Sequence, residues 1–178
     1  CLNKLYESDS ELFNANNGKG VCERCIVFRF AHYLQDRLTD FYVDCDFNSS
    51  LHGHFENGNL VWQRRSGKPI ENPDGTITNR FVDIIVHKRQ EFQINQPNTS
   101  DFICFEIKKW NNNNATQANK DKQNLKILTS RYGYKYGFFL SLHKNKAKSS
   151  WTIFQYGNPL EENLIIFNNE IPNQIQTN

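Results

Sequence analysis

Apolar residues recur along this chain with the spacings of both helices and strands. In the segment 21–38 they stand three or four positions apart, which is the pattern of one buried helix face. The residues on that face are Val27, Phe30, Leu34 and Leu38. A similar stripe predicts a helix over 117–131, and a shorter apolar pattern among acidic residues predicts a first helix over 3–14.

Other segments have the patterns of β-strands. Residues 42–47 alternate between polar and apolar, whereas 81–86 and 102–110 are almost continuously apolar, as in strands at the centre of a sheet. Shorter runs predict strands at 60–62, 134–142 and 151–156, with 151–156 as the last main strand. The Gly-, Asn- and Pro-containing segments predict turns at 48–59 and 64–79 and a long connection at 88–100.

The order of these elements defines a fold class. A helix precedes several strands, and a second helix precedes the remaining strands, which predicts an α/β or α+β protein with a mixed central sheet flanked by helices. The length of 178 residues suits a single domain, 1–178, with its core at about 21–156. The chain begins at Cys1 and contains no Met, so we expect that the natural N-terminus precedes Cys1 or that Met positions are missing.

Two acids and a lysine stand inside the apolar strands. Asp83 interrupts the first strand, where an ionised side chain is costly unless it is paired or binds a metal. Glu106 and Lys108 are two positions apart on the second strand, so their side chains share one face. If the strands are neighbours, Asp83 and Glu106 can hold one Mg²⁺ or Mn²⁺ ion beside Lys108. A buried ion pair between Asp83 and Lys108 is the structural alternative.

Glu23 is a fourth candidate. It falls on the apolar face of the helix 21–38, near the helix N-terminus, where a negative charge is stabilised. A buried partner or ligand explains this position, although a surface salt bridge with Arg24 or Lys19 remains open. His87, after the Asp83 strand, is a further candidate for facing a substrate.

The cysteines and the remaining polar residues give weaker signals. The five Cys are irregularly spaced and do not resemble a disulfide framework. Cys22 and Cys25 form a single CxxC without a second pair, so we interpret them as plain thiols, with a redox role as the alternative. Surface residues are expected at His52, His54, Asp44 and Asp46.

The net charge of the chain says little about its function, but the local distribution of charge is informative. The net charge of +2 excludes a histone-like polycation, and the aromatic content of 13% argues against disorder. Residues 101–150, however, hold ten Lys or Arg against three Asp or Glu. This basic block surrounds Glu106 and Lys108 and favours contact with phosphates, although a solvated helix and hairpin would also explain it. The expected contacts are Lys109, Lys122 and Lys126, with Arg64 and Arg65 in a turn-rich loop.

Together, Glu23 on a helix, Asp83, the sequence Glu106-Ile107-Lys108 and a following helix resemble the PD-(D/E)xK nuclease superfamily. The resemblance covers roughly 21–142 and extends to a bacterial group through VDCDFN at 43–48, VDIIVHKR at 82–89, DKQNLKILTS at 121–130 and GYKYGFFL at 133–140. Val82 stands where many members have Pro.

The resemblance implies a restriction-endonuclease-like core in the order α-β-β-β-α-β. It implies that Asp83, Glu106 and the backbone carbonyl of Ile107 hold Mg²⁺ or Mn²⁺, with Lys108 as the catalytic lysine and Glu23 as the supporting helix acid. The function it implies is metal-dependent hydrolysis of phosphodiester bonds, with DNA favoured over RNA as the substrate and RNA left open. A non-catalytic module of the same fold, binding nucleic acid or protein, is the alternative.

The remaining expectations concern location and assembly. No stretch is long and apolar enough to span a membrane, and no secretory signal is visible, so a cytoplasmic protein is expected. A homodimer is compatible with the resemblance.

Overall fold

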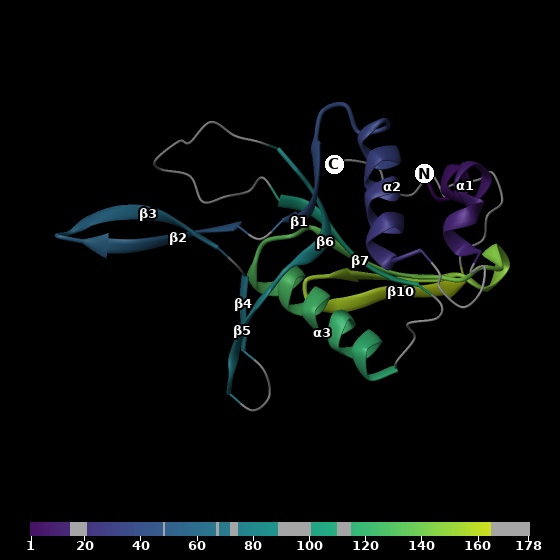
Figure 1. Ribbon diagram of the computed structural model, residues 1–178. Helices are drawn as coiled ribbons and strands as arrows, with labels where there is room; N and C mark the ends of the chain where they lie inside the picture. The colour runs from purple at the N-terminus through teal and green to yellow at the C-terminus, as the bar shows by residue number, and fades with distance from the viewer. Residues whose placement is uncertain are drawn as a thin grey trace.

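The computed structural model of the protein describes residues 1–14, 21–47, 49–66, 68–71, 75–88, 101–109 and 115–164. Its centre is a six-stranded mixed sheet in the order β1-β6-β7-β8-β9-β10 (Figure 1). The strands are β1 (Tyr42–Phe47), β6 (Val82–His87), β7 (Asp101–Lys109), β8 (Tyr136–Leu142), β9 (Ser150–Gln155) and β10 (Asn158–Leu164).

Helices cover both faces of this sheet. On one side lie α1 (Leu2–Ser8), a short 3₁₀ helix (Ser10–Phe13) and α2 (Glu23–Gln35), and on the other lies α3 (Ala115–Arg131) (Figure 1). In chain order α2, β1, β6, β7, α3 and β8 give α-β-β-β-α-β, so the predicted α+β class with a mixed, helix-flanked sheet is confirmed. Among the described residues, no helix is long and apolar enough to cross a membrane.

The strands β7 and β8 are parallel, and α3 makes the crossover between them, as parallel neighbours require. The helix lies close to the sheet at Gly137 of β8. A Cβ added there would stand 3.1 Å from the Thr129 side chain and 3.2 Å from that of Leu125. The absence of a side chain at Gly137 therefore lets α3 pack directly against β8.

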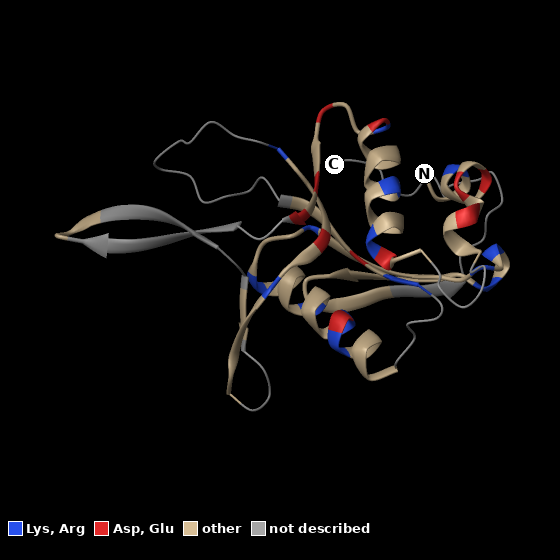
Figure 2. Ribbon diagram, viewed as in Figure 1, with Lys and Arg blue, Asp and Glu red and all other residues tan. Residues whose placement is uncertain are grey.

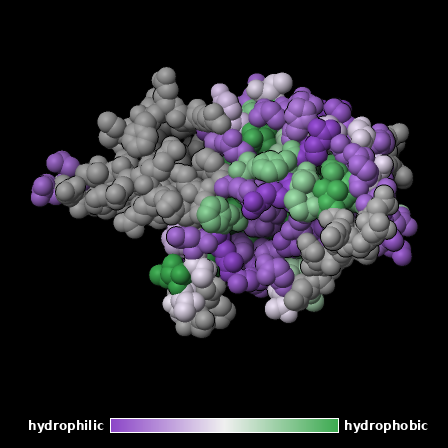
Figure 3. All heavy atoms as spheres, viewed as in Figure 1, coloured by the Kyte–Doolittle hydropathy of each residue, from purple (hydrophilic) through white to green (hydrophobic). Residues whose placement is uncertain are grey.

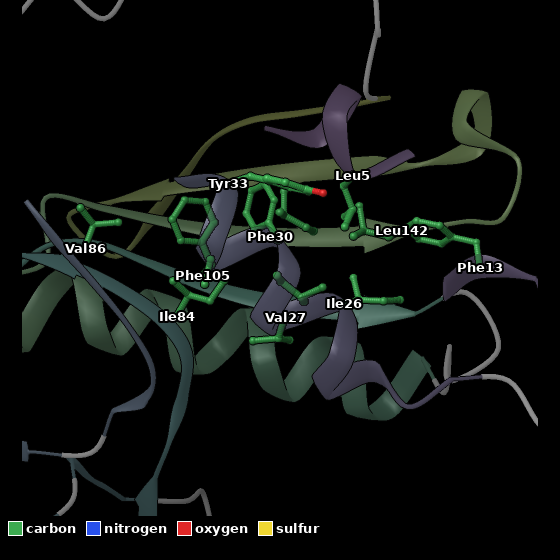
Figure 4. Packing of buried hydrophobic residues seen from close by; sticks show 13 residues of the cluster. Leu5, Phe13, Ile26, Val27, Phe30, Tyr33, Ile84, Val86, Phe105 and Leu142 are labelled. Carbon is green, nitrogen blue, oxygen red and sulfur yellow. The ribbon is translucent and has the colours of Figure 1, made fainter. Parts of the chain in front are cut away.

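Each face of the sheet has its own apolar core. On the α2 side the cluster includes Ile26 and Phe30 of the helix and Ile84 and Ile107 of the sheet (Figure 4). The cluster on the α3 side includes Leu125, Leu128, Ile85 and Cys104. The central strands β6 and β7 are thus packed on both faces, which explains their nearly continuous apolar sequences.

Two hairpins correct the predicted turns at 48–59 and 64–79. The first is β2 (Ser49–Glu56) with β3 (Asn59–Ser66), which projects from the sheet, and the second is β4 (Lys68–Glu71) with β5 (Ile77–Arg80) (Figure 1). Between β2 and β3, Asn57 and Gly58 have φ of 51° and 81°, as a two-residue hairpin turn requires. The strand predicted at 60–62 is therefore only a part of the first half of β3.

Element boundaries also differ in several places. The first helix is interrupted at Asp9, whose φ of −129° is not helical, and α2 is shorter than 21–38. The strand 151–156 is not the last, because a turn at Tyr156 and Gly157 leads into β10. Most of the connection predicted at 88–100 lies outside the described residues.

Candidate active site

Pairing between β6 and β7 sets the position of the two candidate acids. The strands are antiparallel with Ile84 opposite Phe105, so one further step of the same register brings Asp83 opposite Glu106. Directly opposed residues have Cβ atoms about 4.5–5.5 Å apart. Neighbouring residues on β7 fix the face: Ile107 packs in the α2-side core and Cys104 in the α3-side core. The side chains of Glu106 and Lys108 therefore point toward α3.

The carboxyl groups of Asp83 and Glu106 are both costly to ionise. Burial raises the pKa of Asp83 to about 6, although the backbone N–H of Ile107 donates to its Oδ2 at 2.8 Å and favours the charge. Burial raises the pKa of Glu106 well above its ordinary value, and the negative charge of Asp83 raises it further. The proximity of the two carboxyl groups therefore makes it costly to ionise both of them together.

Lys108 lies between two further carboxylates. Its Nζ is 3.2 Å from Oε1 of Glu23 and 3.2 Å from Oδ2 of Asp121, and the lysine side chain is 13% exposed. Burial alone would lower the pKa of Lys108, but Asp121, Glu23 and Asp83 outweigh it and raise the pKa. The Lys108 side chain is therefore a fixed positive charge at neutral pH, and the alternative pairing of Lys108 with Asp83 alone is not what the structure contains.

Glu23 is the first residue of α2, and its carboxylate faces the end of β7. Besides the contact with Lys108, its Oε2 accepts a hydrogen bond from the backbone N–H of Lys109 at 2.9 Å. The surface salt bridge considered for Glu23 is not formed with Arg24, which instead pairs with Asp46 at 3.4 Å. Lys19, the other surface partner considered, lies outside the described residues. The placement of Glu23 toward the buried residues is thus confirmed.

Asp121 is a site residue that the sequence analysis missed. It lies on α3, is 4% exposed, and accepts from Gln117 Nε2 at 2.9 Å through Oδ1. Its Oδ2 is close enough to Lys108 for an ion pair but receives no well-directed hydrogen bond. A signal existed, because Asp121 stands four positions before Leu125 and so continues the predicted apolar stripe of this helix.

The predicted phosphate contacts have different placements. Lys122 and Lys126 lie on α3, whose charged residues are visible beneath the sheet in Figure 2, and both are partly exposed. Lys109 is only 1% exposed, and its Nζ donates to the carbonyl of Val21 at 2.8 Å. That buried hydrogen bond gives Lys109 a structural role in place of the predicted phosphate contact. Arg64 and Arg65 lie on β3, and their side chains are outside the described part of the structure.

The remaining candidates lie outside the site. His87 is buried, with Nε2 2.7 Å from Oδ2 of Asp44, so this acid is paired and His87 has a structural partner. The side chains of His52 and His54 are outside the described part of the chain. Cys22 is exposed and immediately precedes α2, rather than lying within it, and Cys25 is half-buried.

The donor atoms at this site suit a hard divalent cation. Asp83 and Glu106 offer carboxylate oxygens, and Mg²⁺ is commonly held by one or two carboxylates together with water and substrate phosphate. The under-bonded Oδ2 of Asp121 is a further buried oxygen. Within the described ranges, no three or more Asp, Glu, His or Cys side chains are already arranged as a metal-binding group. Occupation would therefore require some rearrangement of these side chains and ionisation of Asp83 and Glu106.

Comparisons with known proteins find little similarity to this chain. No family model matches the chain, and no curated protein matches it. Among solved structures, the crystal structure of SSO0001 matches with a TM-score of 0.39 and 12% sequence identity, over 75% of this chain and 52% of that one. The matched region thus spans about half the length of that protein.

Proposed function

We propose that this protein is a metal-dependent nuclease of the PD-(D/E)xK superfamily that hydrolyses phosphodiester bonds, in DNA rather than RNA. One observation carries the proposal. The positive charge of Lys108 is fixed between Glu23 and Asp121 beside the buried carboxyl pair of Asp83 and Glu106. Ionisable groups with strongly shifted pKa values that cluster in this way are typical of catalytic sites.

The charge state of Lys108 favours one chemical role. Because its pKa is raised, the ammonium group keeps its protons at neutral pH and is unsuited to accept one from water. A fixed ammonium can donate a hydrogen bond to a lone pair of the attacking water. It can also stabilise negative charge that develops on the phosphate. The contacts with Glu23 and Asp121 restrict the position of Lys108 Nζ. Part of the entropy cost of orienting this group is therefore met before substrate binds.

Asp83 and Glu106 would hold Mg²⁺, and the backbone carbonyl of Ile107 is a further proposed ligand. When bound, the ion would supply Lewis acidity toward the phosphate and lower the pKa of a bound water. The N–H of Ile107 already fixes the orientation of Asp83 at 2.8 Å, so this carboxylate needs little rearrangement. Because the pKa values of both carboxyl groups are raised, they must lose their protons before they bind the ion, and alkaline conditions should therefore favour metal binding.

The direct test is cleavage of plasmid DNA and of single-stranded RNA with Mg²⁺ or Mn²⁺. We expect Asp83→Asn, Glu106→Gln and Lys108→Met to lower the rate by at least about 100-fold each, in line with removal of preorganised charge from an active site. Asp83→Asn is the most informative variant, because Asn removes the charge but retains an acceptor for the Ile107 N–H.

Arg24→Gln is the matched control. Arg24 adjoins Glu23 but pairs with Asp46 at the surface, so its loss should leave cleavage unchanged. Equal cleavage by the wild type and Asp83→Asn would overturn the site assignment. Undiminished DNA binding in a protein that never cleaves would instead identify a non-catalytic binding module.

A further inference from the structure

Two thiols flank Glu23 at the start of α2. The Sγ atoms of Cys22 and Cys25 are 3.3 Å apart and hydrogen-bonded to each other. Cys22 is exposed and Cys25 is half-buried, so a small molecule can reach the pair from solvent. The two sulfurs are therefore already adjacent without any rearrangement of the fold.

The surroundings favour Cys22 as the reactive thiol. The hydrogen bond from the Cys25 thiol, followed by the backbone N–H of Cys25, lowers the pKa of Cys22 below its ordinary value. The same pairing raises the pKa of Cys25. An exposed thiol at a helix N-terminus with a lowered pKa is the usual nucleophile of a CxxC pair, and the second thiol then resolves the mixed disulfide.

This thiol pair is physically linked to the candidate site. Glu23, which lies between the two cysteines in sequence, contacts Lys108 Nζ at 3.2 Å and the Lys109 N–H at 2.9 Å. Val21 on the other side of Cys22 accepts from Lys109 Nζ at 2.8 Å. The residues on both sides of Cys22 are thus hydrogen-bonded to the end of β7 that carries the lysines.

We propose that Cys22 and Cys25 form a reversible thiol–disulfide modification site, and that its oxidation displaces Glu23 from Lys108 and slows the reaction of the site. The effect on the reaction rests on the proposed function, whereas formation of the disulfide does not. The oxidant is a low-molecular-weight disulfide, and the reductant is a thiol.

The exchange balances in two steps. The Cys22 thiolate attacks one sulfur of the small disulfide, whose S–S bond breaks and releases one thiolate. The Cys25 thiolate then attacks Cys22 Sγ and releases the second thiolate. Both protons lost from the cysteines end on the two released thiols, so the protein loses two hydrogens and the small disulfide becomes two thiols.

The geometry predicts that disulfide formation disturbs Glu23. A disulfide bond is about 2.05 Å long, so the sulfurs must approach by more than 1 Å from their separation of 3.3 Å. Cys22 has an extended backbone with φ −64° and ψ 149°, just outside the helix, whereas Cys25 is held within it. Adjustment therefore falls on the Cys22–Glu23 peptide, and a displacement of about 1 Å at a catalytic group can cost about 100-fold in rate.

The experiment uses the full chain with oxidised glutathione, followed by dithiothreitol. We expect peptide mass spectrometry to find a Cys22–Cys25 disulfide, a shift of the Lys109 backbone amide resonance, and a loss of plasmid cleavage of at least about tenfold. Reduction should restore all three. The variant Cys22→Ser/Cys25→Ser keeps Glu23 and should be active and insensitive to glutathione.

Two results would overturn the proposal: absence of a Cys22–Cys25 disulfide, or a disulfide that leaves both the Lys109 amide and the cleavage rate unchanged. If the reduced protein cleaves no nucleic acid, the nuclease proposal fails. The thiol proposal is then decided by the disulfide and by the Lys109 amide, which reports the hydrogen bond to Glu23 directly.

Discussion

The carboxyl group of Asp83 is held where its charge is costly. Its pKa of about 6 in the folded state, against 3.8 ordinarily, means that the folded protein binds a proton more tightly than the unfolded chain does. Stability therefore falls as pH rises through this window and remains lower above pH 6. The pKa of Glu106 is shifted in the same direction, since burial and the charge of Asp83 both raise it.

Asp83→Asn should consequently stabilise the metal-free protein. In EDTA above pH 6 we expect a gain on the order of 2–3 kcal/mol in the free energy of unfolding, since each unit of pKa shift corresponds to about 1.4 kcal/mol. Most of the gain should be lost by pH 4, where the folded-state carboxyl is protonated and the unfolded-state carboxyl is close to its ordinary pKa of 3.8. Urea unfolding between pH 4 and 8 measures it. Asp36→Asn, at an exposed ion pair, is the control with little expected change.

An Asp83→Asn variant less stable than the wild type throughout this pH range would contradict the expectation. Such a result would mean that Asp83 contributes to folding through its hydrogen bond with Ile107 more than its charge costs.

At the scale of elements, Asp9 fastens the N-terminal helices to α2. Its Oδ1 accepts from Arg29 Nε at 2.9 Å and is 2.8 Å from Nη2, and its Oδ2 accepts from the Tyr33 hydroxyl. Burial would raise the pKa of Asp9, but the bonds from Arg29 and Tyr33 outweigh it and lower the pKa. A lowered pKa contributes stability that is present above the ordinary value of 3.8 and is lost as pH falls.

Asp9→Ala should therefore destabilise the protein at pH 7. Loss of an acceptor for two buried or half-buried donors costs about 1–3 kcal/mol, and the cost should shrink as pH falls below 4. Thermal unfolding at several pH values measures it, with Glu7→Ala as the control because Glu7 is an exposed residue of α1. A cost that does not change with pH would show that packing, and not the charge of Asp9, is responsible.

The elements differed in how far sequence could predict them. The helix at 21–38 and the central strands have long or strongly apolar patterns, and the structure contains them with small shifts at the ends. The hairpin β2–β3 was missed because its polar and Gly content resembles a loop. Its signature was nonetheless present, since Asn57-Gly58 is a dipeptide that two-residue hairpin turns favour.

The residues of the candidate site also differ in how far the sequence could predict them. The acids Asp83 and Glu106 and Lys108 were identifiable because a charge inside an apolar strand needs an explanation. The local pattern places Asp121 on the apolar stripe of α3, but the partners of Asp121 and Lys109 depend on how α3 and α2 dock on the sheet. For Lys109 the strand alternation would place it on the face opposite Lys108, so its burial followed from a feature already in the sequence.

At the scale of the molecule, charge is spread unevenly over the surface. The coloured part of the face in Figure 3 is largely hydrophilic, with scattered apolar groups. The helix α3 belongs to the block with ten Lys or Arg and three Asp or Glu, and it covers the sheet face toward which Lys108 points. A phosphate backbone would thus meet positive charge close to the site.

Replacement of Lys122 and Lys126 together by Ala should weaken nucleic-acid binding equally for all sequences. Each phosphate contact contributes about 0.9 to the slope of log affinity against log salt concentration, so the slope should fall by roughly 2. Fluorescence anisotropy across a salt series measures it. Arg37→Ala removes an exposed cation beyond the opposite end of α2 and is the control. An unchanged slope in the double variant would place the phosphate path elsewhere.

The contacts that join α2 to β7 have a consequence for biosynthesis. Glu23 meets Lys108 and Lys109 across 85 and 86 residues, and α3 must then follow before Asp121 is in place. During translation, Glu23 and Asp83 are synthesised before Lys108, which contacts Glu23 in the folded protein. Such non-local contacts form late in folding. Any activity of this site would therefore begin only after α3 has been translated, and an interrupted chain would be inert.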